Sequence, residues 1–287
     1  MKIAIIGAGA VGLLTAKVLE DKGHDVTLIV RSPKEGPVLF QTTAGEVQLV
    51  AFKLTTDWEL IAQMNLVIVA TKTYHLNGIL SQLMAVTCPI LFLQNGLIKD
   101  QVEQTLDCSR VLYGSVDHGA LLEGDMLMHM GEGTIRFGGN EKFRHSLNEL
   151  APALIWEDKI EDILFRKAIL NTLINPLTAL VDVPNGELWS NQDLQRAVIS
   201  HYDELHMAFP EVEQHVTLDE VFELIKRTRL NSSSMRKDVL QGSQTEASAI
   251  LLPLIERAEK ANRYLPITSY LFQLIQSKRS ENHTERP

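Results

Sequence analysis

Three polar side chains recur at every fourth residue in an otherwise apolar stretch of the chain. Lys167, Asn171 and Asn175 would lie on one face of a helix, because residues four apart are neighbours on a helix surface. An ammonium group can donate a proton or stabilise a negative charge, and an amide both donates and accepts hydrogen bonds. Such a row is often only a solvated helix face. The apolar, glutamate-poor flanks favour a binding site for a small polar ligand instead.

Several residues after this row could complete the site. Pro176 lacks a backbone N–H and should kink or locally open the helix. Asn185, in the turn 184–186, either lines the ligand site or only forms the turn. Ser234 lies in a polar segment that is typical of a helix start, although its hydroxyl could hold a carboxylate. Glu246 precedes an apolar run, where it either caps a helix or faces the ligand, and taken alone capping is the commoner case.

The element that would position a cofactor is a glycine-rich loop near the N-terminus. A β-branched run over 2–6 precedes this loop, and a helical pattern follows it, which is the order that a dinucleotide site requires. The first glycine permits the tight turn, the second lets a pyrophosphate approach the backbone, and the third allows close packing of helix and strand. The helix N-terminus would bind the phosphates. The loop consists of Gly7, Ala8, Gly9, Ala10, Val11 and Gly12.

The residue after the second strand, which spans 25–30, predicts the type of cofactor. NAD enzymes usually carry a carboxylate there, which bonds the ribose 2′-hydroxyl. This chain carries Arg31, followed by Ser32 and Lys34. A guanidinium would pair with a 2′-phosphate, although an exposed loop arginine is the alternative. We therefore expect NADP(H) rather than NAD(H).

Three further strands end in polar or small residues, at the sheet edge where ligands bind in open α/β folds. Lys72 follows the strand over 66–70 and would contact cofactor or substrate, unless it is a solvated loop lysine. Asn95 follows the strand over 89–93 and could bond the nicotinamide ribose or the substrate. After the strand over 111–117, His118 could act as a general acid, although a turn histidine is commoner. We expect the neighbouring Ala120 to contact the cofactor.

The pattern of elements predicts two domains. Residues 38–55 suggest a hairpin, and residues 126–130 and 134–137 suggest an antiparallel hairpin that makes one sheet edge mixed. After residue 158 the β-branched runs stop, and helical periodicity covers 159–182, 190–207, 217–228, 243–262 and 267–278. The fold class is therefore α/β, with a Rossmann-type NADP-binding domain over 1–158 and an all-α substrate and catalytic domain over 159–287.

Composition excludes several classes of partner. The 287 residues, 45% of them hydrophobic, are enough for two cores. The net charge of -9 disfavours nucleic acid and anionic membranes, and no apolar run reaches the roughly 18 residues of a membrane span. Cys88 and Cys108 lack metal-ligand spacing and are expected to be buried thiols in a reducing, cytoplasmic compartment. We predict no metal site, and the sequence leaves a homodimer open.

Taken together, the motifs resemble the ketopantoate reductases (2-dehydropantoate 2-reductases) over almost the whole chain. The resemblance implies a C-terminal domain like that of 6-phosphogluconate dehydrogenase relatives, and NADPH-dependent reduction of ketopantoate to pantoate for pantothenate and coenzyme A synthesis. The motifs are the glycine loop, Arg31, Lys72, Gln94-Asn95-Gly96, the stretch 167–188 with I-N-P-L-T-A and N-G-E-L, Ser233-Ser234-Met235, and Thr245-Glu246.

The resemblance also implies roles for individual residues. Lys167 matches the catalytic lysine, which would stabilise the developing oxyanion and protonate it as hydride arrives. Such a lysine, starting near a pKa of ~10.4, needs partial burial to be an efficient acid. Glu246 matches the active-site glutamate, and Asn95 a residue that contacts cofactor and substrate. The substrate-binding matches are Asn171, Asn175 and Ser234, with Asn185 in the N-G-E-L turn.

The sequence differs from the family's pattern at two places, and two other functions remain as alternatives. Leu251-Leu252-Pro253 replaces the family's usual Asn-Gly or Gly-Tyr pair after the glutamate, and His75 stands where glutamine is frequent after the lysine motif. One alternative is a reductase of another small 2-oxo acid on the same scaffold. The other is a non-catalytic NADP(H)-sensing module, which would have no need of the aligned lysine and asparagines.

Overall fold

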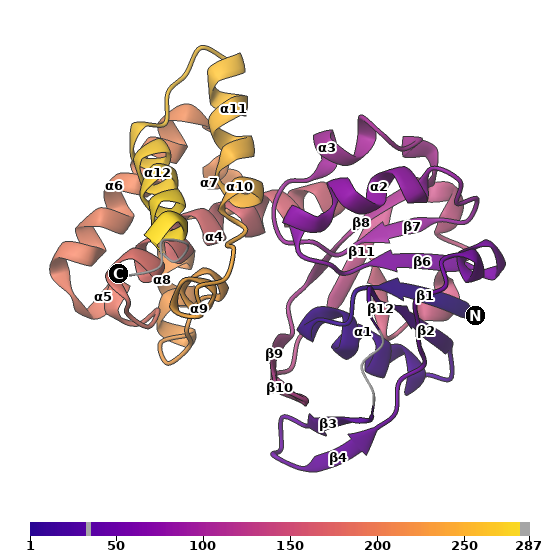
Figure 1. The fold of residues 1–287 in the computed structure, drawn as a ribbon. Helices are drawn as coiled ribbons and strands as arrows, with labels where there is room; N and C mark the ends of the chain where they lie inside the picture. Colours follow the sequence, from indigo (N-terminus) through magenta and orange to yellow (C-terminus); the bar gives the residue numbers. More distant parts are fainter. Residues whose placement is uncertain (33–35, 282–287) are drawn as a thin grey trace. The chain divides into compact units, whose positions relative to one another are not determined.

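A computed structural model describes residues 1–32 and 36–281 of the chain (Figure 1). It divides into two compact units, one formed by Met1–Gln94 with Lys99–Glu161 and the other by Asn95–Ile98 with Asp162–Pro287. The predicted division between residues 158 and 159 lies three residues before the boundary between Glu161 and Asp162. The sequence does not indicate that the short segment 95–98 belongs with the helices.

The first unit is organised on an eight-stranded sheet in the order β12-β11-β8-β7-β6-β1-β2-β5. All neighbouring strands are parallel except β11 and β8, so the predicted mixed edge is confirmed. The central strands are β-branched and leucine-rich because both faces of the sheet are covered. The strands are β1 (Lys2–Ile6), β2 (Asp25–Ile29), β5 (Leu54–Thr55), β6 (Leu66–Val69), β7 (Ile90–Phe92), β8 (Val111–Val116), β11 (Ile135–Gly139) and β12 (Leu154–Trp156).

The order of the strands reverses between β1 and β6. From β1 the chain moves through α1 (Ala10–Glu20) to β2 on one side, and later strands add on the other side, beginning with β6. Right-handed crossovers then put α1 on one face and α2 (Asn77–Leu83) and α3 (Lys99–Glu103) on the other, as Figure 1 shows. In such sheets, ligands bind where the strand order reverses.

A second sheet of four strands, in the order β4-β3-β10-β9, corrects one predicted hairpin. Strand β10 pairs antiparallel with β9 and parallel with β3, whereas β11 belongs to the large sheet. The predicted pairing of 126–130 with 134–137 is therefore wrong, while the hairpin predicted within 38–55 is confirmed by β3 and β4. The strands are β3 (Val38–Gln41), β4 (Val47–Val50), β9 (Gly119–Glu123) and β10 (Met126–Gly131).

The second unit is helical and packs its own apolar core, which includes Leu173, Leu205 and Ile225. Helix α4 continues through Pro176 without a break. The local opening of the helix that the sequence suggested at this proline is therefore not found. The helices are α4 (Ile160–Val181), α5 (Glu187–Ser190), α6 (Gln192–Ala208), α7 (Val212–His215), α8 (Leu218–Arg227), α9 (Ser234–Leu240), α10 (Ala247–Ile250), α11 (Leu252–Lys260) and α12 (Pro266–Glu281).

A buried polar cluster holds the start of α12 against α6. The carboxylate of Glu204 accepts hydrogen bonds from the backbone N–H groups of Ile267 and Thr268 and from the Thr268 hydroxyl. Because that hydroxyl donates to Glu204, it must accept from Nε2–H of His201, at 2.9 Å. Burial lowers the pKa of His201 to about 4. The imidazole is therefore neutral, and Glu204 provides the charged cap of α12.

The two cysteines differ in environment. Cys88 is half-buried, and burial raises the pKa of its thiol, so thiolate chemistry is disfavoured. Cys108 is exposed at the start of a short turn before β8, so the prediction that both are buried is wrong. Among the described residues, no helix is both long and apolar enough to cross a bilayer.

Candidate functional site

The glycine loop follows β1 directly and forms the N-terminus of α1. Gly9 is the N-cap residue of α1, and the first helical turn contains no acidic side chain. The N–H groups of Ala10 and Val11 therefore begin the helix at its electropositive end, without a carboxylate that would repel phosphate. This arrangement can bind the pyrophosphate of a dinucleotide.

Two glycines of the loop have different surroundings. A Cβ on Gly12 would lie 2.0 Å from the carbonyl oxygen of Gly7, so Gly12 is needed for packing within the turn. A Cβ on Gly9 would meet no atom within 4 Å, and Gly9 has an ordinary φ of -80°. Neither packing nor conformation demands glycine at position 9. Glycine at this position leaves the backbone accessible to the close approach of a ligand, as expected for a dinucleotide-binding loop.

The predicted cofactor contacts outside the loop lie on several elements of the first unit. Arg31 is exposed just after β2, and it lies near His75, whose pKa is lowered by burial and then by the charge of Arg31. Lys72 is half-buried after β6. Ala120 is half-buried in β9, paired with His129. Lys34 lies outside the described residues.

A pocket lies beside the glycine loop and the end of β2. It contains about 480 Å³ of space that includes some open solvent, and its lining is mostly apolar. Ala8 and Leu13 contribute from the loop side, Val30 from the strand end, and Phe52 and Leu122 from neighbouring segments. Its place beside the glycine loop makes this apolar hollow a candidate for contact with a bound ligand.

The polar row of the second unit lies along α4, as the spacing predicted. Lys167 and Asn171 are half-buried, and Asn175 is only 6% exposed. The side-chain amide of Asn171 donates a 2.8 Å hydrogen bond to the Oδ1 atom of Asn95. The structure therefore brings together two residues that the sequence placed in different halves of the chain.

The segment Asn95–Ile98 is attached to the helical unit through its backbone. The N–H of Leu97 donates to the carbonyl oxygen of Ala249 at 2.9 Å. Gly96 has φ +110°, and a Cβ there would lie 2.3 Å from the same oxygen. Only glycine permits this close approach. The contact holds Asn95 in the unit that carries α4 and α10.

Glu246 lies at the N-terminal end of α10 and is 8% exposed. It is the N-cap residue of α10, as the capping alternative predicted, but its side chain makes no capping hydrogen bond. Its backbone carbonyl accepts from the N–H groups of Ala249 and Ile250, which fixes the turn beside the segment 95–98. The second unit thus combines a buried carboxylate, an ammonium and amides, which are the groups needed to bind and protonate a small oxo acid.

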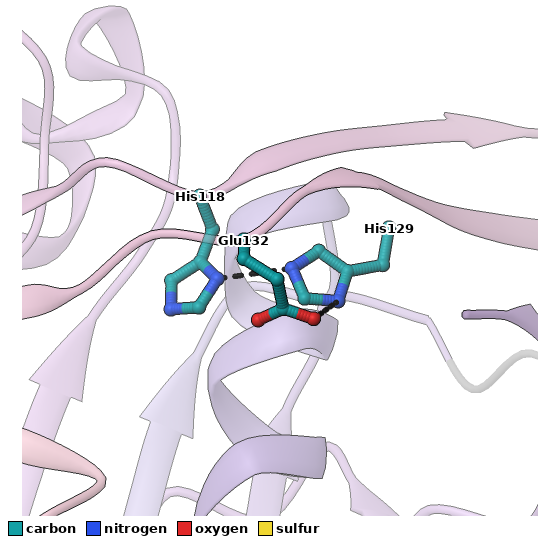
Figure 2. A group of neighbouring side chains, drawn as sticks. All are labelled: His118, His129 and Glu132. Atoms are coloured by element: carbon teal, nitrogen blue, oxygen red, sulfur yellow. Dashed lines mark hydrogen bonds and ion pairs between the residues drawn. The ribbon is translucent and has the colours of Figure 1, made fainter. Parts of the chain in front are cut away.

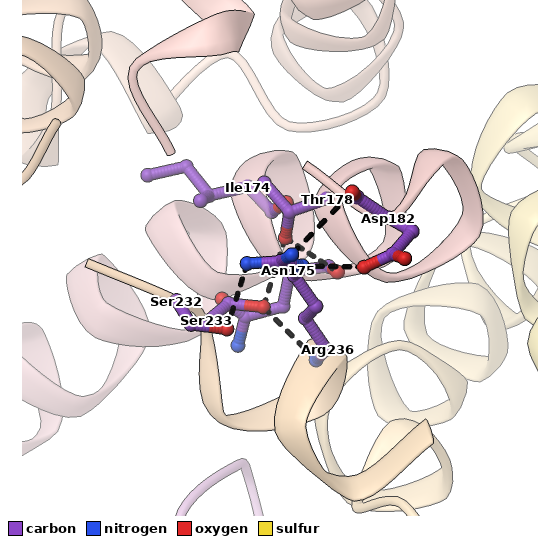
Figure 3. Close-up of polar contacts among 7 residues, drawn as sticks. All are labelled: Ile174, Asn175, Thr178, Asp182, Ser232, Ser233 and Arg236. Atoms are coloured by element: carbon purple, nitrogen blue, oxygen red, sulfur yellow. Dashed lines mark hydrogen bonds and ion pairs between the residues drawn. The ribbon is translucent and has the colours of Figure 1, made fainter. Parts of the chain in front are cut away.

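The serines before α9 are held against the end of α4 (Figure 3). Ser233 is buried, accepts from the Arg236 N–H at 3.1 Å, and shares a 2.8 Å hydrogen bond with the hydroxyl of Thr178. Arg236 also binds the carboxylate of Asp182 at 2.8 Å. These contacts position the first residue of α9, Ser234, which is itself exposed.

Asn185 and Gln94 have buried side-chain polar atoms that form no hydrogen bond with the described residues. Asn185 is 8% exposed, and its amide donates to Thr228 while its Oδ1 atom has no partner within the described part of the chain. Gln94, at the end of β7, is 5% exposed, and neither side-chain polar atom has such a partner. Gln94 belongs to the Gln94-Asn95-Gly96 motif, but the sequence assigned a role only to Asn95.

A mostly parallel sheet with a dinucleotide-type glycine loop, followed by a helical unit with a row of polar side chains on α4, is the arrangement of the two-domain Rossmann dehydrogenase class. Comparison with known proteins identifies the particular family. The family model described as Ketopantoate reductase PanE/ApbA matches residues 3–142, and its C-terminal counterpart matches residues 159–279. The chain belongs to the ketopantoate reductase family.

Individual relatives match over nearly their whole length. A 2-dehydropantoate 2-reductase of Listeria innocua is 32% identical over 99% of this chain and 98% of its own. The crystal structure of a probable 2-dehydropantoate 2-reductase from Bacillus subtilis superposes with a TM-score of 0.82 at 28% identity, covering 97% of this chain and 100% of that one. A dimeric ketopantoate reductase from Staphylococcus aureus shares the fold, with a TM-score of 0.81 at 19% identity, covering 98% and 100%.

Proposed function

We propose that this protein reduces ketopantoate to pantoate with NADPH, in pantothenate and coenzyme A biosynthesis. The observation that carries the proposal is the cluster in the second unit, where Asn171 is bonded to Asn95 one helical turn from Lys167. The relatives named as 2-dehydropantoate 2-reductases support the choice of substrate. We also propose that the first unit binds the cofactor and the second unit the substrate.

In this reaction each residue has a distinct task. NADPH supplies a hydride to the carbonyl carbon, and negative charge develops on the carbonyl oxygen. The ammonium of Lys167 stabilises that charge and transfers its proton to the oxygen. Asn95, Asn171 and Asn175 orient the substrate through amide hydrogen bonds, and the carboxylate of Glu246 accepts a hydrogen bond from a substrate hydroxyl or from the lysine.

The proposal is tested by measuring NADPH oxidation with a series of oxo acids. Ketopantoate should be turned over with a kcat/KM at least about tenfold above that of unbranched 2-oxo acids, because each extra apolar contact is worth roughly 1–3 kcal/mol. A higher value for an unbranched acid would assign the enzyme to that substrate. NADPH binding without turnover of any oxo acid would instead identify a sensing module.

Replacement of Arg31 tests the proposed preference for NADP(H). Arg31→Asp should weaken NADPH binding about 10–100-fold, because a charge-assisted hydrogen bond worth roughly 1.5–3 kcal/mol is replaced by repulsion. NADH, which lacks the 2′-phosphate, should lose much less. Titration of the intrinsic fluorescence with both cofactors measures the two changes.

The matched control for this experiment is Lys22→Asp, which makes the same change of charge at an exposed turn after α1. It should leave both affinities nearly unchanged. Equal losses for NADPH and NADH in Arg31→Asp would contradict a 2′-phosphate contact.

We further propose a cytoplasmic homodimer. The net charge of -9 and the biosynthetic role fit the cytoplasm. A dimer is supported by the description of the Staphylococcus aureus relative as dimeric. Light scattering on the purified protein gives the mass, and a monomer at micromolar concentration would refute the dimer.

A further inference from the structure

Two histidines and a glutamate converge at one end of the β9–β10 hairpin (Figure 2). His118 directly precedes β9, His129 lies within β10, and Glu132 follows β10. Each offers one ligand atom, and these three atoms all lie within 4.8 Å of one another. The proposed reduction uses none of these side chains, so their convergence needs another explanation.

The two imidazole rings face each other through their nitrogens. Nδ1 of His118 and Nε2 of His129 are 2.9 Å apart, and the N–H of Gly133 also donates to Nδ1 of His118 at 3.2 Å. Nδ1 of His118 is therefore an unprotonated acceptor, and Nε2 of His129 carries the shared hydrogen. The Oε1 atom of Glu132 lies 3.8 Å from the other ring nitrogen of His129.

The cluster is buried on the side of His129 and exposed to solvent on the side of Glu132. The side chain of His129 is 9% exposed and its ring packs on that of Phe40. Glu132 is 73% exposed, and the hydroxyl of Thr43 donates to its Oε1 atom at 3.0 Å.

We propose that His118, His129 and Glu132 bind one divalent transition-metal ion, for which Zn²⁺ is the best match. Two imidazole nitrogens and a carboxylate oxygen are a common ligand set for zinc, with water as the fourth ligand. Nitrogens that share a tetrahedral zinc ion lie about 3.3 Å apart, so the observed 2.9 Å must open by only about 0.4 Å.

Binding requires one rearrangement of hydrogens and no other reactant. The hydrogen on Nε2 of His129 moves to Nδ1, which faces Glu132, and both facing nitrogens then present lone pairs to the ion. The Gly133 N–H exchanges its imidazole acceptor for water. The sequence predicted no metal site on the spacing of the cysteines alone. Residues 118 and 129 are brought together by the pairing of β9 with β10.

The test is zinc binding to the purified full-length protein, freed of any affinity tag and of bound metal. Zn²⁺ is titrated in competition with a chromogenic chelator, and Co²⁺ is added separately to record its visible absorption bands. We expect one ion per chain. His129→Asn and Glu132→Gln should weaken binding at least about 10–100-fold, as is usual for disruption of a metal site.

A second site variant and a control variant guard against misfolding and against nonspecific zinc binding. Glu132 is exposed, so Glu132→Gln should fold even if His129→Asn does not. The control variant His145→Asn replaces an exposed histidine of the same unit and should bind like the wild type. An affinity unchanged by both site variants, or less than one ion per chain at millimolar zinc, would overturn the proposal. Neither result depends on reductase activity.

Discussion

Replacing Lys167 with alanine should lower kcat for ketopantoate about 10²–10⁴-fold, the contribution that a positioned proton donor typically makes. The side chain is half-buried on α4, one turn from the Asn171–Asn95 hydrogen bond, so a substrate held by those amides lies within its reach. Removal of the ammonium leaves the developing oxyanion without its counter-charge and its proton. Initial rates of NADPH oxidation at saturating substrate measure the loss.

The controls separate chemistry from binding. The affinity for NADPH should remain near the wild-type value in Lys167→Ala, because most of the proposed cofactor contacts, the glycine loop, Arg31 and Lys72, lie in the other unit. Lys159→Ala removes an exposed lysine just before α4 and should retain full activity. If Lys167→Ala kept kcat within about threefold of the wild type, another group would have to be the acid.

The second large effect concerns stability. Glu204→Ala should lower the free energy of unfolding of the helical unit by about 2–6 kcal/mol, because each of two buried N–H groups left without an acceptor costs about 1–3 kcal/mol. Glu204 is 6% exposed, and its loss leaves the N–H groups of Ile267 and Thr268 unsatisfied at the start of α12. Urea denaturation followed by circular dichroism measures the change.

Two further variants define the cause. Glu204→Gln keeps one acceptor oxygen and should lose clearly less than the alanine variant. Asp203→Ala removes an exposed carboxylate from the neighbouring position of α6, where a surface change costs within about 0.5 kcal/mol. An alanine variant at position 204 as stable as Asp203→Ala would show that the start of α12 does not depend on this cap.

Local patterns in the sequence predicted the strands well and their partners less well. Runs such as 2–6 and 66–69 were recognisable because buried parallel strands are β-branched almost throughout. The hairpin at 126–137 was assigned wrongly because a glycine turn shows where the chain can reverse, not which strand it will pair with. Pairing of β10 with β9 and β3 depends on long-range packing.

The candidate site shows the same limit. The spacing along α4 predicted a common face for Lys167, Asn171 and Asn175, because helical periodicity is local information. The hydrogen bond between Asn171 and Asn95 joins residues 76 positions apart and had no local signal. The convergence of His118 with His129 likewise follows from strand register alone.

The attachment of residues 95–98 to the helices has a consequence for how the protein is made. The ribosome releases Leu97 long before Ala249, the residue whose carbonyl its N–H must meet. In the nascent chain, residues 95–98 therefore lack their hydrogen-bonding partner until most of the chain has been synthesised. The segment 95–98 can therefore reach its final position only late in translation, after the partners of Leu97 and of Asn95 have been synthesised.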